Sequence, residues 1–272
     1  MTHVVITGSS RGIGYALARR FLELGCRVTI AGRSDESTAA GHQQLADALP
    51  EKAQLLSSQT CDVSRRADLE ALWEHASARA PVDIWINNAG VSPPPKLFWD
   101  VPASSLEDAI ESNVKGAILG SWVAVRGMRA QKSGTIYNVL GFGSDGMIYP
   151  GALAYGASKR AIDYVTKALT KEARGSGVRV CSLQPGAVRT EMVAAEWEEQ
   201  CASSRFMAAF IGALALDPDE AAHLLAPRVL ANTREGAVIR PWSSVVSWAR
   251  LLRVPWGLLR GALGDARYAI RS

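Results

Sequence analysis

Cysteine is scarce in this 272-residue sequence, and its four cysteines include no Cys-x-x-Cys pair. Closely spaced pairs are typical of zinc sites, and a dense set of cysteines is typical of small secreted disulfide-bonded proteins. The sequence therefore predicts no metal site and no disulfide framework, and we expect a reducing, cytoplasmic environment. The cysteines are Cys26, Cys61, Cys181 and Cys201.

Long apolar runs are also missing. The longest nearly uncharged stretch, residues 206–216, is well short of the roughly 20 apolar residues that span a bilayer. The sequence enters a β-type segment at once, without the basic start, apolar region and cleavage site of a targeting segment. We therefore expect neither a transmembrane helix nor a targeting segment.

The small net charge of +4 comes from the C-terminal region, residues 240–272, where six arginines face one aspartate and three tryptophans are interleaved. Such a mixture is typical of surfaces that contact membranes or nucleic acid. A helix that packs its tryptophans on the body and leaves arginines in solvent gives the same pattern. We favour the packed helix and expect no nucleic-acid partner, with peripheral membrane contact through 241–272 as the alternative.

Short β-rich runs alternate with helical ones along the chain, and 48% of the residues are apolar. This alternation predicts an α/β fold: a doubly wound parallel sheet of the Rossmann type, with about seven strands and helices on both faces. The predicted strands are residues 4–7, 28–31, 54–57, 82–87, 135–139, 178–183 and 237–239.

Start and stop signals place several helices between these strands. A helix over 12–24 is expected to end at Gly25, a second to open at Ser64, and a third to begin near Ser104 after the stiff Pro93-Pro94-Pro95 connection. A further helix is predicted to start at Asp217-Pro218.

No internal repeat divides the sequence, so a single domain over 1–272 is the simplest organisation. Residues 1–186 would serve mainly for cofactor binding and catalysis. Residues 187–216 would form an insertion that acts as a lid over the substrate, and 241–272 a basic extension that contains tryptophan.

A glycine-rich segment stands where the first strand meets the first helix. Its spacing is Gly-x-x-x-Gly-x-Gly, and glycines at such a turn let backbone amides and a helix N-terminus approach a pyrophosphate. A tight strand-to-helix turn without a ligand is the alternative, but its position at the start of a βαβ unit favours nucleotide binding. The candidate residues are Gly8, Ser10, Arg11, Gly12, Ile13 and Gly14.

The end of the second strand indicates which nucleotide binds. NAD-binding folds of this type usually place a carboxylate there to hold the ribose hydroxyls, whereas this sequence reads Ile30-Ala31-Gly32-Arg33-Ser34. Arg33 and Arg11 can both reach a 2′-phosphate, which favours NADPH over NADH. Simple solvation of both arginines is the alternative.

Tyr155 and Lys159 stand four residues apart, on one face of a predicted helix. A phenol near pKa 10 is a poor acid or base at neutral pH, and a nearby ammonium is expected to lower that pKa. The pair therefore suits proton transfer coupled to hydride transfer.

Together these motifs resemble the short-chain dehydrogenase/reductase family over residues 4–240. The Thr7–Gly14 turn, Asn87-Asn88-Ala89-Gly90, Asn113 and the Tyr155/Lys159 pair match its motifs. Cys61-Asp62-Val63 resembles its adenine-binding turn, and the segment from Pro185 to Thr190 its nicotinamide-binding loop.

The resemblance implies roles for these residues. Tyr155 would be the acid/base, Lys159 would hold the ribose and tune Tyr155, and Asn113 would support a proton-relay water, although an asparagine inside a helix can also cap a neighbouring turn. The implied cofactor contacts are Asp62, Val63, Asn88, Ala89, Gly90, Tyr155, Lys159, Pro185, Gly186, Val188 and Thr190.

One position departs from the family pattern. The serine expected about thirteen residues before the tyrosine is replaced by Phe142, between Gly141 and Gly143. Ser144 lies next in this glycine-rich loop, and we expect it to polarise the substrate carbonyl in place of the missing serine. A loop serine that only forms a turn is the alternative.

Within the family the chain resembles the chlorophyll b reductase-like members, through Ile84–Gly90, the Asn138–Gly146 loop and Tyr155–Arg160. The resemblance implies reduction of a formyl group on a bulky, apolar small molecule by a homodimer or homotetramer. Apolar residues of 191–216 could wall a wide pocket or simply pack against the body or another subunit. A non-catalytic NADPH-binding sensor or scaffold is the alternative function.

Overall fold

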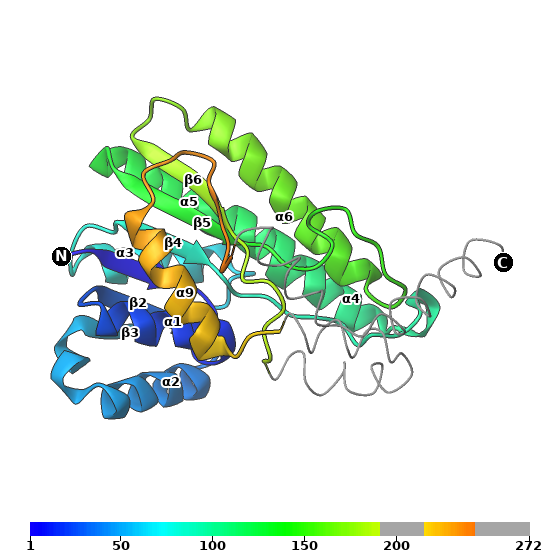
Figure 1. Cartoon of the computed structure of the whole chain (residues 1–272), viewed down its shortest axis with the longest axis horizontal. Coiled ribbons are helices and arrows are strands. Elements are labelled where there is room, and N and C mark those ends of the chain that lie inside the picture. The colour runs from blue at the N-terminus through cyan, green and yellow to red at the C-terminus, as the bar shows by residue number, and fades with distance from the viewer. Residues whose placement is uncertain (191–214, 243–272) are drawn as a thin grey trace.

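A computed structural model describes residues 1–190 and 215–242 of the chain. Its sheet has seven parallel strands in the order β3-β2-β1-β4-β5-β6-β7, with helices on both sides (Figure 1). The predicted doubly wound α/β fold is confirmed. The strands are β1 (His3–Ile6), β2 (Arg27–Gly32), β3 (Leu56–Thr60), β4 (Ile84–Asn87), β5 (Gly134–Val139), β6 (Val178–Leu183) and β7 (Val238–Ile239).

The strand order reverses between β1 and β4. The chain runs outward from β1 through β2 to β3, then crosses back to place β4 on the other side of β1. Loops that leave the carboxyl ends of these two strands diverge in opposite directions, and open sheets of this type bind their ligands at that point. The fold therefore directs attention to the loops after β1 and β4.

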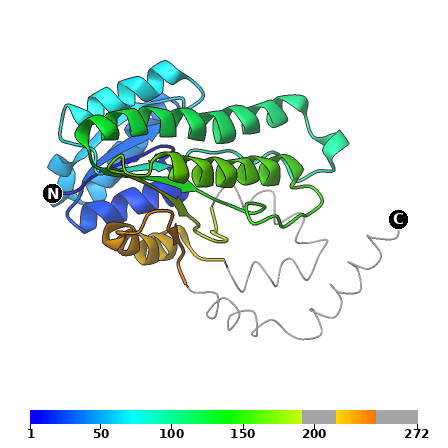
Figure 2. The same ribbon diagram turned by 90° about the horizontal axis from the view of Figure 1, so that it is seen from above.

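Two helical layers cover the sheet (Figure 2). On one face Phe21, Leu45 and Leu225 join one apolar core, while Leu72 and Met128 belong to the core of the opposite face. Strands covered on both faces need almost continuous apolar runs, which explains the fully buried β1 and β4. The layers are α1 (Gly12–Glu23), α2 (Asp35–Ala48) and α9 (Pro218–Ala231) against α3 (Arg66–Ser77), α5 (Gly116–Gln131) and α6 (Leu153–Glu172).

Helix α1 ends as the sequence predicts. Gly25 adopts a φ of +78° and donates its N–H to Leu22 O at 2.9 Å, while the N–H of Cys26 reaches Phe21 O at 2.9 Å. These bonds satisfy carbonyls that the last helical turn leaves without partners. The chain can then turn directly into β2.

Two local predictions are wrong. Residues 50–55 form the 3-10 helix η1 (Pro50–Leu55), so β3 begins at Leu56 rather than at residue 54. Proline at the first position of that turn favours a helical start over a strand. Ser64 does not cap α3 either, because its hydroxyl donates to Asp62 Oδ1 at 2.8 Å and the helix begins after Arg65.

The connection from β4 to α5 is irregular. After the short 3-10 helix η2 (Phe98–Asp100), α4 (Ala103–Ala109) continues into the π-helical η3 (Ile110–Lys115) and then into α5. A π-turn widens a helix and redirects its side chains, and such turns occur often at functional sites. In this chain the widened turn carries the buried Asn113.

The predicted insertion starts and ends at paired backbone. Val188 and Leu216 form an isolated parallel bridge, and the N–H of Arg189 donates to Leu216 O at 2.8 Å. The predicted lid and the basic tail fall mostly on residues 191–214 and 243–272, which lie outside the described residues. In the part of the chain that is described, no helix has the length and apolar character needed to cross a bilayer.

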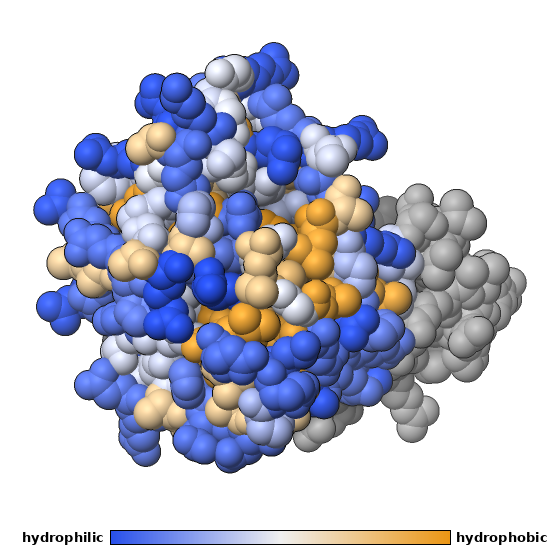
Figure 3. All heavy atoms as spheres, turned by 90° about the vertical axis from the view of Figure 1, so that its left-hand side faces the viewer, coloured by the Kyte–Doolittle hydropathy of each residue, from blue (hydrophilic) through white to orange (hydrophobic). Residues whose placement is uncertain are grey.

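The end of the molecule that carries the N-terminus is mainly hydrophilic around an apolar middle band (Figure 3).

At the first residue of β1, His3 is completely buried, with Nδ1 3.2 Å from Ala80 O and Nε2 2.9 Å from Thr29 Oγ1. Burial, assisted by Arg27 and Arg79 and opposed by the hydrogen bond to Ala80 O and by Asp83, lowers the pKa of His3 below its ordinary value of 6.5.

We expect the free energy of unfolding to decrease as pH falls below about 6.5, because the unfolded chain then binds a proton that buried His3 resists. The slope from one group is at most about 1.4 kcal/mol per pH unit. Urea midpoints between pH 7.5 and 5.5 (about one unit either side of that value) measure it, and His3→Gln should have a weaker pH dependence. An unchanged dependence in His3→Gln would contradict the assignment.

Candidate active site

The turn after β1 and the loop after β4 are packed directly against each other. Gly8 has a φ of +61°, and a Cβ atom there would lie 2.6 Å from Ala89 Cα. Thr7 Oγ1 accepts the N–H groups of Asn88 and Ala89 at 3.1 Å, and the Asn88 amide donates to Thr7 O and Gly8 O at 2.9 and 2.8 Å. The Asn88 side chain thus holds the turn in place, and the cofactor contact implied for this residue stays a prediction.

The turn presents the N-terminus of α1. Arg11 precedes the helix in an extended conformation and its side chain does not cap it, so the first-turn N–H groups and the helix dipole are available to an anion. Gly12 has a φ of +60°, and a Cβ atom there would lie 3.6 Å from Thr190 Cγ2. Ile13 packs on the apolar core, which leaves its backbone to line the turn.

Helix α2 fixes this turn from outside. A Cβ atom on Gly41 would stand 2.8 Å from Ser10 Cα, so α2 approaches the turn as closely as backbones allow. A Cβ atom on Gly14 would meet Gly8 O and Asn88 Nδ2, both at 2.4 Å. The cradle therefore requires glycine at several places and fits a dinucleotide pyrophosphate.

The end of β2 lies beside the same turn. A Cβ atom on Gly32 would be 2.7, 3.0 and 3.1 Å from the hydroxyl oxygens of Thr38, Ser37 and Ser10. Arg33 and Arg11 are both exposed. Hydroxyl groups therefore gather where an adenosine ribose would lie in this type of fold, and the two exposed arginines stand next to this place in the sequence.

Asp62 and Val63 form the turn after β3. The Asp62 Oδ1 atom accepts the N–H and hydroxyl of Ser64 at 3.0 and 2.8 Å, and buried Val63 packs against Gly116, whose Cβ position would be 2.7 Å from Val63 Cγ2. Packing against α5 thus fixes the position of this turn relative to the helix. The adenine contact implied for the two residues stays a prediction.

The loop after β6 lies near the same cradle. Pro185 and Val188 are buried, whereas Gly186 is exposed with a φ of +82° and open space around its Cβ position. Thr190 reaches Gly12, as described above. The loop therefore borders the glycine turn, and the nicotinamide contacts implied for it stay predictions.

Tyr155 and Lys159 meet on the first turns of α6, next to the loop after β4. The Lys159 ammonium lies 5.6 Å from the centre of the Tyr155 ring and donates to Val139 O at 3.1 Å. A Cβ atom on Gly90 would be 3.8 Å from Lys159 Nζ and 3.0 Å from Asn113 Oδ1. The structure thus brings Tyr155, Lys159, Asn113 and Gly90 together.

Asn113 is a clamp between elements. Its Oδ1 accepts the N–H of Val91 at 2.7 Å, and its Nδ2 donates to Val91 O and Ser158 Oγ, both at 2.9 Å. Ser158 in turn donates to Tyr155 O at 2.7 Å. The side chain therefore caps a neighbouring loop, the alternative that the sequence left open, and it connects that loop to the helix of Tyr155.

Burial controls the protonation of the pair. It raises the pKa of Tyr155 to about 12 and lowers the pKa of Lys159 to about 8. The sequence predicted a lowered pKa for Tyr155, and the shift is in the opposite direction. Burial of the phenol has a larger effect on its pKa than the Lys159 ammonium, which donates its hydrogen bond to Val139 O. At neutral pH the phenol therefore keeps its proton, and Lys159 is still mostly charged.

The glycine loop after β5 shapes the space around the Tyr155 hydroxyl. A Cβ atom on Gly141 would be 2.5 Å from that oxygen, and one on Gly143 would be 2.6 Å from Gly156 Cα. Ser144 is buried and its carbonyl accepts Arg160 Nη1 at 2.8 Å. Within the described residues no hydrogen bond joins the hydroxyls of Ser144 and Tyr155, so the polarising role of Ser144 stays a prediction.

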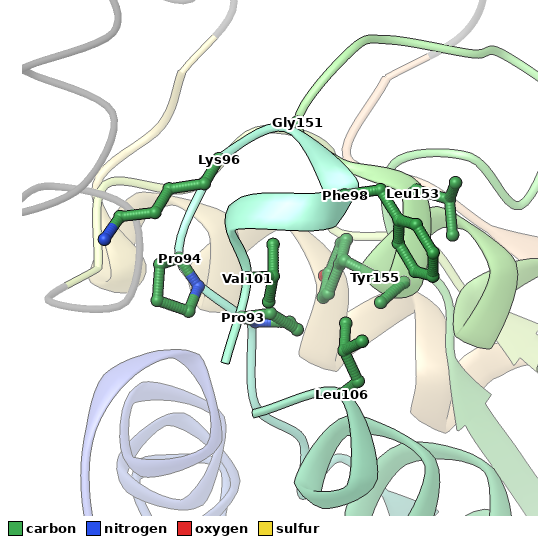
Figure 4. Close-up of a pocket in the computed structure, with 10 residues that line it drawn as sticks. Pro93, Pro94, Lys96, Phe98, Val101, Leu106, Gly151, Leu153 and Tyr155 are labelled. Atoms are coloured by element: carbon green, nitrogen blue, oxygen red, sulfur yellow. The ribbon is translucent and has the colours of Figure 1, made fainter. Parts of the chain in front are cut away.

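A shallow pocket opens beside Tyr155. In Figure 4 the tyrosine reaches in from α6, between Val101 on one side and Leu153 on the other, while Lys96 extends away from it on the Pro94 side. The walls are mainly apolar, which suits contact with the apolar part of a ligand. The lining residues are Pro93, Pro94, Lys96, Phe98, Val101, Leu106, Gly151, Leu153, Ala154 and Tyr155.

Several residues that build the site have structural roles that the sequence did not indicate. Gly41 lies inside α2, Ser158 lies between the two motif residues of α6, and Arg160 fixes the glycine loop. Each acts through a partner that is distant in the sequence. Thr7 is different, because it opens the glycine motif and its place in the turn was therefore visible in the sequence.

A cradle for a dinucleotide beside a protonated tyrosine and a buried lysine defines a class of oxidoreductase. The family model for short chain dehydrogenases matches residues 2–201. The chain belongs to the short-chain dehydrogenase/reductase family and is an oxidoreductase that uses a nicotinamide cofactor.

Among its relatives is chlorophyll(ide) b reductase NOL of Arabidopsis thaliana, described as chloroplastic, which is 34% identical over 244 residues, or 87% of this chain and 67% of that protein. The protein of the same name from Oryza sativa subsp. japonica is 33% identical over 269 residues, covering 95% and 76%. A variant of actinorhodin polyketide ketoreductase crystallised with NADPH has a TM-score of 0.76 and 25% identity, covering 88% of this chain and 95% of that one.

Proposed function

We propose that this chain reduces a carbonyl group, and specifically a formyl group on a large apolar molecule, with NADPH as the reductant. The observation that carries the proposal is the position of Tyr155 in the lining of a mainly apolar pocket, with the Lys159 ammonium 5.6 Å from the centre of its ring. The names of the two plant relatives support a formyl-bearing substrate.

In this proposal the substrate carbonyl oxygen lies against the Tyr155 hydroxyl. A nicotinamide held in the cradle would supply the hydride that converts the carbonyl carbon to an alcohol carbon. Tyr155 gives its proton to the oxygen as negative charge develops there, and the nearby Lys159 charge stabilises the resulting phenolate. Ser144 would donate to the same oxygen if its loop turns the hydroxyl inward.

The test is a screen of aldehydes, ketones and formyl tetrapyrroles in which loss of NADPH absorbance is followed. Turnover of a formyl compound, with the matching alcohol identified as product, would support the proposal. Tight NADPH binding without turnover of any compound would instead support the competing function, a non-catalytic NADPH sensor or scaffold.

We further propose that NADPH is preferred over NADH. Arg33 and Arg11 are exposed and directly follow Gly32 and Ser10, which lie close together at the end of β2, and guanidinium groups bind a phosphate better than a ribose hydroxyl.

The variant Arg33→Ala should weaken NADPH binding by roughly tenfold, since one charge-assisted contact contributes about 1.5 kcal/mol. NADH binding should change little, because it lacks the 2′-phosphate. Equilibrium titration of both nucleotides measures the effect, and Arg174→Ala, an exposed arginine near Glu235, is the matched control. Equal losses for both nucleotides in Arg33→Ala would contradict the proposed preference.

Self-association is also proposed, as a homodimer or homotetramer. Exposed apolar side chains follow one face of η3 and α5, at Ile110, Ile118 and Trp122, with Arg126 Cζ 4.5 Å from the centre of the Trp122 ring. Such a stripe supports contact with another protein surface.

Membrane contact through the tail and a cytoplasmic location stay predictions.

A further inference from the structure

We infer that the substrate of the Tyr155 pocket carries an anionic group, a carboxylate in the simplest case, and that Lys96 binds it. The inference rests on the proposed function and narrows its substrate class. Among the described residues that line the pocket, Lys96 alone is charged. A large apolar carbonyl compound would place its carbonyl at Tyr155 and its anionic group at the Pro94 side of the opening (Figure 4).

The backbone around Lys96 is held in place. Pro93, Pro94 and Pro95 restrict the chain that leads to it, and the N–H of Lys96 donates to Pro94 O at 2.8 Å. The proline rings of 93 and 94 belong to the pocket wall. The lysine is therefore presented from a stiff edge of the pocket rather than from a freely moving loop.

Lys96 has no anionic partner within residues 1–190 and 215–242. Lys115 and Lys167 form ion pairs with Glu111 and Asp163 on their own helices, and Lys96 differs from other unpaired lysines of the described residues, such as Lys171, in that it lines the pocket. A lysine side chain at the edge of an apolar pocket, with no carboxylate partner among those described residues, is suited to an external anion. The side chain is exposed, so the pair would be weakened by salt and would contribute a modest part of the affinity.

The experiment compares acids with their esters. Formylbenzoate, formylnaphthoate and formylbiphenylcarboxylate, each with formyl and carboxylate groups at opposite ends, are measured beside their methyl esters, so that several lengths are covered. Equilibrium dialysis gives binding to the full chain, and NADPH consumption gives KM and kcat. We expect the acid of best length to bind to wild type more tightly than its ester, and added salt to weaken the acid alone.

In Lys96→Met the KM and dissociation constant of that acid should rise roughly three- to fivefold, well beyond any change for its ester, and the salt dependence should be lost. Lys96→Glu should weaken the acid further. Lys171→Met is the matched control, because this exposed lysine lies at the far end of α6, roughly 24 Å along the helix from Tyr155.

Equal effects of Lys96→Met on acid and ester, or no effect on either, would overturn the inference. Because dialysis needs no turnover, the outcome is independent of the proposed reaction. Selective binding of the acid without any NADPH consumption would keep the anion site and reject the reductase. Turnover of formyl compounds without any preference for the acid would keep the reductase and reject the anion site.

Discussion

The variant Tyr155→Phe should lose turnover by about 10²- to 10⁴-fold, the range for removal of a general acid. The change deletes one oxygen from a side chain whose ring remains packed against the Lys159 ammonium. Because the glycine turn is untouched, binding of NADPH should stay close to wild type. Steady-state kinetics on a verified carbonyl substrate and nucleotide titration measure the two effects.

Tyr164→Phe is the matched control for this experiment. Tyr164 lies on the same helix, but its side chain is 74% exposed and lies outside the residues that line the pocket. Its loss of a hydroxyl should leave turnover unchanged. Wild-type turnover in Tyr155→Phe would remove Tyr155 from the mechanism, and parallel losses in both variants would indicate damage to α6 rather than to the chemistry.

The variant Gly141→Ala should lower kcat by about 100-fold, since a shift of about 1 Å in a reacting group has an effect of that size. The added methyl group would lie 2.5 Å from the Tyr155 hydroxyl oxygen and 3.2 Å from its Cζ atom. The tyrosine must then move away from the place where the carbonyl oxygen is expected. Nucleotide affinity should change little, because the cradle lies on the loops after β1 and β4.

Gly156→Ala serves as the control in the same part of the site. A Cβ atom there would be 3.8 Å from Gly143 Cα, which is an ordinary contact, and alanine favours the helix. We expect near-normal kcat and equal or higher stability in thermal unfolding. Normal kcat in Gly141→Ala would contradict the close approach of Gly141 to the tyrosine.

Much of the site was predictable because its motifs are local. The glycines at 8, 12 and 14 and the pair Tyr155/Lys159 depend on spacing along a turn or a helix, and such spacing is fixed by backbone geometry. Element boundaries were less predictable. The strand expected at residue 54 gave way to η1, because a proline-initiated turn and an apolar strand compete over the same few residues.

The sequence alone determined the parallel fold, the position of the nucleotide-binding turn and the family. These follow from the order of apolar runs and from motifs that act within a few residues. The tertiary structure decided the protonation of Tyr155, the clamping role of Asn113, the contact of Gly41 with Ser10 and the place of Lys96 beside the pocket. Each of these depends on burial or on partners from distant segments, and only the folded chain brings them together.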